Sequence, residues 1–123
     1  MSSYLIVKCN DVELINYSRS SYIYQAFNEC LGYSEEWQEL NLNTVYSALE
    51  NLKDSIEAKK FIMAKYQTML LHLKLYDDIW NATSHIQDLE KEIKELEDAC
   101  YRVRFIADIM KDNEDKKFLW CFN

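Results

Sequence analysis

A short polar run, Ser18-Arg19-Ser20-Ser21, holds the side chains with the clearest chemical potential, and it directly precedes a predicted helix. Hydroxyls, a guanidinium and free backbone N–H groups at a helix start attract an anion, because the helix dipole adds positive potential there. Arg19, Ser20 and Ser21 are therefore candidates for binding a small anionic, nucleotide-like ligand. Ordinary helix capping is the simpler explanation, since it requires only one of these serines.

A second candidate cluster combines Asp77 and Asp78 with His72 and His85, residue types that could hold a metal ion or transfer a proton. Aspartates at a turn and histidines in solvent explain the same residues without chemistry. The sequence contains no glycine-rich phosphate loop, no HExxH and no GxSxG. We therefore expect no catalytic residue, no metal and no cofactor.

The cysteines are widely scattered and form no CxxC pair, at positions Cys9, Cys30, Cys100 and Cys121. A zinc site would need four ligands from distant segments, with only two histidines to help. In a reducing compartment these thiols are expected to be small buried apolar side chains.

Two apolar heptad runs, residues 45–73 and 75–110, dominate the chain but do not share one frame. Alternating spacings of four and three residues place one apolar seam on each run. The first frame, continued, would put Asp77 and Trp80 on the seam and leave Ile79, Ala82 and Ile86 off it. A turn between the runs resolves this mismatch and predicts two long helices that bury their seams on each other, either within one chain or between two. The predicted seams are Val45, Leu49, Leu52, Ile56, Lys59, Met63, Tyr66, Leu70 and Leu73, followed by Leu75, Ile79, Ala82, Ile86, Leu89, Ile93, Leu96, Cys100, Val103, Ala107 and Met110.

Charge favours a turn near Tyr76-Asp77, because lysines of the first helix then lie opposite acids of the second. This register places Lys59 by Glu92 or Glu95. A turn at residues 81–84 would instead bring like charges together, although the capping box Ser84-x-x-Gln87 favours it. The other pairs expected from the earlier turn are Lys65–Asp88, Lys53–Asp98 and Glu50–Arg102.

The ends of the chain predict a small sheet. Residues 4–9 and 12–17 are β-prone around Asn10-Asp11, which tolerate the left-handed conformations of a hairpin turn. Ser20 or Ser21 should cap a short helix that ends at Gly32. Residues 117–122 are again β-prone and should add a third strand, because an isolated two-stranded hairpin is marginal in water.

Further expectations concern the linking segment and the long helices. Ser34 should cap one more turn through Trp37, and Asn41 or Asn43 should cap the first long helix. Residues 87–97 are polar outside the seam and should project from the body. The second long helix becomes apolar nearly all round towards its end, so the sheet and the short helix should pack there, against Tyr101, Phe105, Ile106 and Ile109.

The predicted fold is therefore α+β in a single domain of 123 residues. Residues 1–33 form the N-terminal β-hairpin and the short helix. Residues 34–112 form a long antiparallel helical hairpin, a coiled-coil arm, and residues 116–123 contribute the C-terminal strand to a small antiparallel sheet.

Composition excludes several classes of protein. Apolar residues make up 49% of the chain, which is too many for a disordered acidic tail. The net charge of −7 and the dispersed lysines do not favour nucleic-acid binding. Met1-Ser2-Ser3-Tyr4 does not open a secretory leader and no window reaches the length of a membrane span, so we expect a cytoplasmic protein.

Large apolar residues near the expected turn indicate a partner surface. Leu71, Tyr76 and Trp80 lie outside the seams, and exposed apolar clusters mark interaction sites unless they pack locally. Several acidic residues without a matching lysine are further candidates for partner binding, or, less favoured, for mimicry of nucleic acid: Glu35, Glu36 and Glu39. A second apolar stripe through Ala48, Ile62 and Met69 could pair with its copy and form a homodimer with a four-helix arrangement.

The function predicted from these features is non-enzymatic binding of another protein, as a small acidic inhibitor or adaptor. In composition alone the chain resembles virus-encoded accessory proteins that inhibit host machinery such as CRISPR effectors, which implies action in the host cytoplasm. Sequestering a small anionic ligand at Arg19, Ser20 and Ser21 is the alternative.

Overall fold

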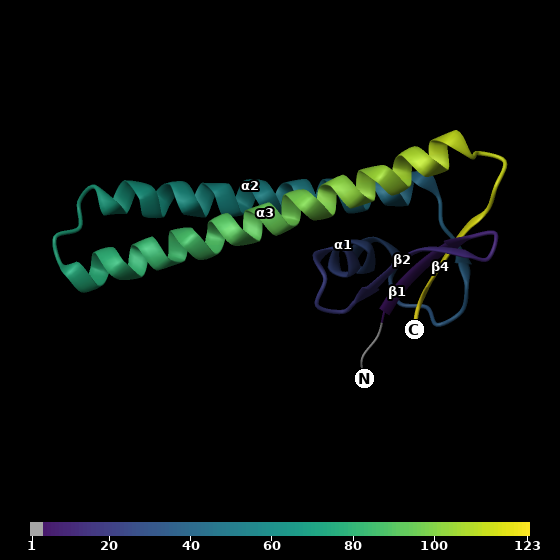
Figure 1. The fold of residues 1–123 in the computed structure, drawn as a ribbon, viewed down its shortest axis with the longest axis horizontal. Helices are drawn as coiled ribbons and strands as arrows, with labels where there is room; N and C mark the ends of the chain where they lie inside the picture. Colours follow the sequence, from purple (N-terminus) through teal and green to yellow (C-terminus); the bar gives the residue numbers. More distant parts are fainter. Residues whose placement is uncertain (1–3) are drawn as a thin grey trace.

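The computed structural model describes residues 4–123, which form one four-stranded antiparallel sheet and three helices (Figure 1). This confirms the predicted α+β class. Met1, Ser2 and Ser3 of the N-terminal segment discussed above lie outside the described residues. The elements are β1 (Tyr4–Cys9), β2 (Val12–Ser18), α1 (Tyr22–Leu31), β3 (Gln38–Glu39), α2 (Leu42–Leu70), α3 (Tyr76–Asp112) and β4 (Phe118–Phe122).

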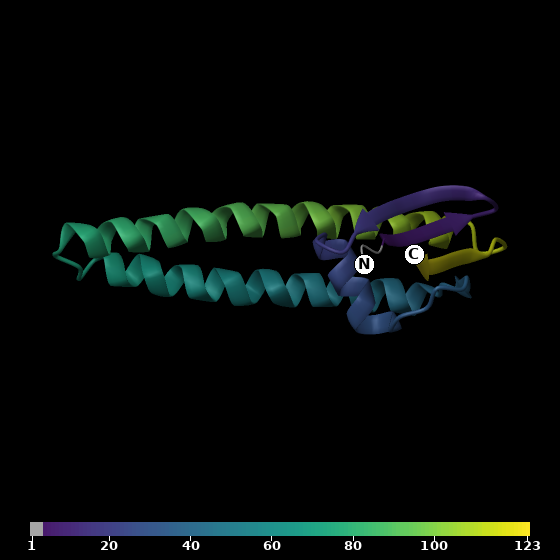
Figure 2. The same cartoon turned by 90° about the horizontal axis from the view of Figure 1, so that it is seen from below.

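Helices α2 and α3 fold back on each other within one chain and extend well beyond the sheet (Figures 1 and 2). Helix α2 ends at Leu70 and α3 begins at Tyr76, so the earlier of the two expected turns is correct. The apolar core ends at Ile56 on α2 and begins again at Ile93 on α3. Residues 57–92 therefore project from the body, and we call them the arm.

The heptad seams are buried as predicted over most of their length. Buried seam residues include Val45, Leu49, Leu52 and Ile56 on α2 and Ala82, Ile86, Ile93, Leu96, Cys100, Val103, Ala107 and Met110 on α3. Because both seams are apolar and face each other, burying them removes apolar surface from water along two long helices. Along the arm the seams are less enclosed, because Leu75 and Ile79 are exposed and six other seam residues are only half-buried: Lys59, Met63, Tyr66, Leu70, Leu73 and Leu89.

One of the predicted interhelical ion pairs forms and three do not. Lys59 Nζ lies 2.8 Å from Glu92 Oε2, which confirms that pair and the register that it implies. Lys53 instead pairs with Glu50, and Arg102 with Asp98, each within its own helix. Lys65 is also not paired as expected, because its ammonium lies 4.6 Å from the centre of the Phe61 ring.

The sheet has the strand order β2-β1-β4-β3, so the C-terminal strand pairs with β1 as predicted. Asn10 and Asp11 form the hairpin turn with φ values of 49° and 67°, the left-handed conformation that these two residue types tolerate. The short strand β3 was not predicted. The expected helical turn from Ser34 through Trp37 is wrong, because the Ser34 hydroxyl closes a bend by hydrogen bonds to the N–H and C=O of Glu36.

The predicted caps are confirmed at two helix starts. The Ser21 hydroxyl accepts a hydrogen bond from the Ile23 N–H at the start of α1, and Asn41 Oδ1 accepts one from the Thr44 N–H at the start of α2. Gly32 ends α1 with a φ of 70°, a left-handed conformation that suits glycine.

The body of the protein forms where the sheet and α1 cover one side of the helical pair (Figures 1 and 2). Its most enclosed side chains come from the sheet, from α1 and from the helical pair, and they include Leu5, Phe27, Val45, Val103 and Phe122. Ala48 belongs to this core and is fully buried, whereas Ile62 and Met69 are exposed, so the predicted second stripe is wrong at Ala48. A four-helix dimer could therefore use Ile62 and Met69 but not Ala48, and the predicted homodimer stays a prediction.

The end of α3 is covered on fewer sides than expected. Ile106 is buried and Ile109 half-buried, as predicted, but Tyr101 and Phe105 are 69% and 60% exposed. These two rings therefore do not contribute to the core. No helix of the described residues combines the length and hydropathy needed to cross a membrane.

Candidate functional site

Large apolar side chains stand in solvent at the far end of the arm, where α2 turns into α3 (Figure 1). Leu71, Tyr76 and Trp80 are 81%, 77% and 60% exposed, so none of them is buried by local packing. Leu75 is also largely exposed. We call these four residues the tip: Leu71, Leu75, Tyr76 and Trp80.

Helix termination does not explain the residue types at the tip. The turn is closed by backbone hydrogen bonds, with the N–H of His72 bonded to the C=O of Met69 at 2.9 Å. Leu75 occupies the N-cap position of α3 and makes no capping hydrogen bond through its side chain. Serine, aspartate or asparagine would normally stabilise a helix start by about 1 kcal/mol. The turn thus keeps leucine where a polar residue would improve folding.

A hollow of about 250 Å³ lies beside the tip, between the last turns of α2 and the first turns of α3. Tyr66 and His85 face each other across the two helices, with ring centres 5.0 Å apart and the planes stacked. The hollow is lined by Tyr66, Met69, Leu73, Asp78, Asn81, Ala82 and His85. The tip therefore offers both projecting side chains and an adjacent concave surface.

The predicted metal or proton site at this turn gains no support. Asp77 and Asp78 occupy the first turn of α3, where carboxylates interact favourably with the helix dipole. His85 stacks on Tyr66, and no three His, Cys, Asp or Glu side chains among residues 4–123 are grouped to hold a metal ion. Helix stabilisation thus accounts for the aspartates.

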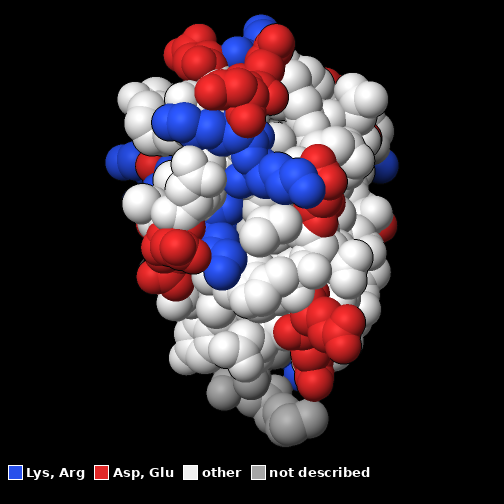
Figure 3. Space-filling view, turned by 90° about the vertical axis from the view of Figure 1, so that its right-hand side faces the viewer, with Lys and Arg blue, Asp and Glu red and all other residues white. Residues whose placement is uncertain are grey.

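The acidic candidates Glu35, Glu36 and Glu39 are all exposed, but they lie near the sheet at the opposite end of the molecule (Figure 1). Since α2 alone has 29 residues, they are roughly 40 Å from the tip. One compact interface cannot include both groups. Figure 3 views the sheet end and shows basic side chains gathered between groups of carboxylates, so this end is not uniformly acidic.

The anion-site candidates lie around the start of α1, but the hydroxyls of the two serines are already engaged. Ser21 caps the helix, and the hydroxyls of Ser20 and Ser18 are hydrogen-bonded to each other at 3.0 Å. A cavity of about 280 Å³ opens here, and Arg19 does not line it. The lining residues are Tyr17, Ser20, Ser21, Tyr22, Ile23, Glu95, Asp98, Ala99 and Arg102.

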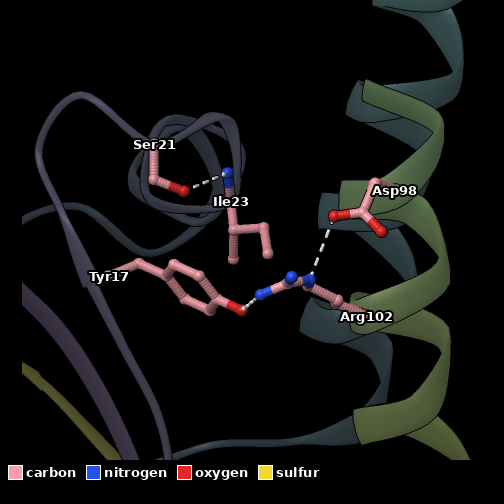
Figure 4. A network of polar contacts seen from close by, with 5 residues as sticks. All are labelled: Tyr17, Ser21, Ile23, Asp98 and Arg102. Atoms are coloured by element: carbon pink, nitrogen blue, oxygen red, sulfur yellow. Dashed lines mark hydrogen bonds and ion pairs between the residues drawn. The ribbon is translucent and has the colours of Figure 1, made fainter. Parts of the chain in front are cut away.

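Arg102 of α3 supplies the positive charge in this cavity (Figure 4). Its Nη1 donates a hydrogen bond to the Tyr17 hydroxyl at 2.6 Å, and its Nε lies 3.1 Å from Asp98 Oδ2. The Tyr17 hydrogen bond and the neighbouring Asp98 carboxylate raise the pKa of Arg102. Because Glu95 and Asp98 also line the cavity, this geometry disfavours an anionic ligand. The sequence could not identify Arg102, which lies 85 positions from Tyr17.

The cysteines behave as apolar side chains and are all free thiols. Cys100 and Cys121 are buried, as predicted, whereas Cys9 and Cys30 are half-buried. Burial raises the pKa of the Cys30, Cys100 and Cys121 thiols, which lowers the thiolate fraction and therefore the reactivity at neutral pH.

A second apolar groove, of about 210 Å³, was not anticipated from the sequence and lies between β2 and the end of α3. Its walls include the exposed rings of Tyr101 and Phe105. Both rings are visible in the sequence as apolar residues at the end of the second helix, where their pattern predicts burial.

Comparison with protein-family models, with curated proteins and with solved structures finds no match to this chain. Functional inference therefore depends on the surfaces themselves.

Proposed function

We propose that this chain is a protein-binding module that presents the tip of its helical arm to a partner protein and acts as an inhibitor or adaptor of that partner. The observation that carries the proposal is the joint exposure of the four tip residues at the connection between α2 and α3: Leu71, Leu75, Tyr76 and Trp80. Exposed apolar clusters of this kind are uncommon on monomeric proteins and mark interaction surfaces.

The side chains at the tip are those that contribute most to protein interfaces. Tryptophan and tyrosine are enriched among residues whose truncation weakens binding by 2 kcal/mol or more, because each buries a large apolar area with few rotatable bonds. Trp80 follows Tyr76 by one helical turn, so the two rings lie on the same side of α3. Together with the adjacent hollow, they give the tip a shaped surface.

The arm holds the tip in a fixed position. The buried seam residues Ala82 and Ile86 and the Lys59–Glu92 ion pair join α2 and α3 between the body and the tip. A partner would therefore meet a pre-organised surface, and little conformational entropy would be lost on binding. This rigidity supports a role in which the arm reaches into or across another protein.

Charge indicates the chemistry of the partner. Asp77 and Asp78 lie at the tip beside the exposed Lys74, and Asp88 and Glu90 follow two to three turns further along α3; none of these four carboxylates forms an ion pair with another described residue. A partner surface with an apolar pocket surrounded by lysine or arginine would complement both the rings and these carboxylates. We propose a partner of this kind.

The proposal is tested by capturing partners from the native host with the full chain at submicromolar concentration. The test variant is Tyr76→Ala with Trp80→Ala, and the control is Phe105→Ala, which removes a ring of the same 60% exposure as Trp80 from the same helix. A specific partner should be captured by the wild type and by the control but lost with the tip variant. Binding of the purified partner should then weaken by about thirty-fold or more, which corresponds to 2 kcal/mol.

Two results would contradict the proposal. The first is a partner that binds the tip variant and the wild type equally while circular dichroism shows both to be folded. The second is loss of folding in the tip variant, which would show that the rings stabilise the arm. Binding that is insensitive to salt between 50 and 300 mM would contradict the basic surroundings proposed for the pocket.

A further inference from the structure

Strand β2 forms a free edge of the sheet, since it pairs with β1 on one side only. It is seven residues long, whereas β3 at the opposite edge has only two. Long free edges present unpaired backbone N–H and C=O groups to which another strand can add. The edge of β2 is therefore the position where the described sheet can be extended.

The pairing of β1 with β2 has a bulge at Leu14, and beyond it, from Ile15 to Ser18, the direction of the backbone groups of β2 follows from the regular sheet register. Tyr4 exchanges both of its backbone hydrogen bonds with Asn123 on the β4 side, so the groups of the next residue, Leu5, point towards β2. Leu5 is opposite Tyr17, and Val7 is opposite Ile15. The backbone groups of Tyr17 and Ile15 therefore point inwards, and those of Asn16 point outwards to the free edge.

The apolar groove described above lies along this same edge. Leu14, Ile15 and Tyr17 of β2 form one wall, and Tyr101 and Phe105 are on the α3 side. The two exposed rings offer roughly 250 Å² of apolar surface beside the strand. An added strand would thus gain backbone hydrogen bonds and, at the same time, cover apolar side chains.

We propose that a second copy of this chain occupies this edge, with the two β2 strands antiparallel and centred on Asn16. In this register each Asn16 N–H donates to the Asn16 C=O of the other copy. Glu13, near the start of β2 in each copy, then lies near Arg19, which directly follows the end of β2 in the other copy. Both residues are exposed and form no ion pair within residues 4–123, so the edge is complementary in charge to itself.

The twofold arrangement also explains why association would stop at a dimer. Each copy uses its single long edge, and the edges left at the ends of the joined sheet are the two-residue β3 strands. A strand pair with four aromatic rings is a small interface, so we expect a dissociation constant on the order of 10 µM. The dimer lies at the body and leaves the tip free for another protein.

The proposal is tested by sedimentation of the full chain between 1 and 200 µM. Asn16→Pro removes an outward N–H group and adds a ring at the edge, and proline is tolerated on an edge strand where the N–H faces solvent. Asn16→Thr is the matched control, because threonine keeps the donor and favours strands. We expect at least ten-fold weaker dimerisation for the proline variant and no loss for the threonine variant.

Charge reversal tests the register without changing the backbone. Glu13→Arg or Arg19→Glu alone places like charges near each other at both ends of the strand pair and should weaken association several-fold. The double variant Glu13→Arg with Arg19→Glu restores opposite charges and should recover the wild-type dissociation constant. Both positions are exposed, so folding should be unaffected.

Three results would overturn the proposal. One is a strict monomer at 200 µM, and another is a dimer that is unaffected by Asn16→Pro and by the single charge reversals. The third is a dimer that is lost with Tyr76→Ala and Trp80→Ala, which would place self-association at the tip. Failure of partner capture alone would leave the sedimentation result unchanged, so the two proposals fail separately.

Discussion

Replacing Leu96 by alanine tests whether the three helices meet in a shared core. Leu96 is 1% exposed and lies beside Ala26 of α1 and Leu52 of α2. The substitution removes three carbon groups, each contributing about 0.8 kcal/mol when buried, and leaves a cavity that the surrounding helices fill only in part. We expect the free energy of unfolding to fall by about 2–4 kcal/mol and the melting temperature by roughly 8–15 °C.

The measurement is urea unfolding followed by circular dichroism, with Leu71→Ala as the matched control. Leu71 is the same residue type at 81% exposure, so its truncation should change stability by less than about 0.5 kcal/mol. A loss below about 1 kcal/mol for Leu96→Ala would refute the enclosed position of this side chain between α1 and α2. Equal losses in the two variants would show that the tip is packed.

Three smaller predictions follow from the polar contacts and the thiols. Lys59→Leu removes a partly exposed ion pair but extends the apolar seam, so thermal unfolding should show a change within about 1 kcal/mol. Tyr17→Phe removes the hydrogen bond from Arg102 and should lower stability by no more than about 1 kcal/mol in urea, without loss of the fold. Burial raises the pKa of Cys100 and Cys121 above 9.0, so the folded state holds these protons more tightly than the unfolded state. The free energy of unfolding should therefore be independent of these thiols below pH 9 and fall as the pH rises through 9 towards their folded pKa values. The urea midpoint should be lower at pH 10 than at pH 7.5. Replacing both cysteines by alanine should reduce this difference.

The helical hairpin was predictable because the spacing of apolar residues along the chain shows which face of each helix is buried. The change of frame after Leu73 located the turn within a few residues, and the charge pattern placed Lys59 beside Glu92. The hairpin turn at Asn10-Asp11 was predictable for a similar reason, since it depends on local backbone preferences.

Other features depend on tertiary structure and left no local signal. Strand β3 consists of two exposed polar residues, and the adjoining Leu40 N–H bonds to the Phe118 C=O at 2.7 Å, a contact set by β4. The apolar end of α3 indicated burial, but the sequence does not show how wide the sheet is. Because β2 is the edge strand, Tyr101 and Phe105 stay exposed.

Leu71, Tyr76 and Trp80 of the tip were predictable as positions outside the seams, but their exposure was not, and Leu75 was expected on the second seam. Sequence reasoning left local packing of Trp80 as an alternative, and only the arrangement of α2 and α3 shows that no neighbour covers it. The acidic candidates Glu35, Glu36 and Glu39 stay a separate prediction, because α2 separates them from the tip.

The strand order has a consequence for how the chain folds. Strand β4 lies between β1 and β3, so the sheet cannot be completed until residues 118–122 return to the N-terminal hairpin. Closing so long a loop is entropically costly for a flexible chain. The α2–α3 hairpin can form early, because the contacts next to its turn join residues that are close in the sequence. Once the two helices are paired, α3 brings β4 back to β1. During synthesis the arm should therefore fold first, and the body should fold only after β4 has been synthesised.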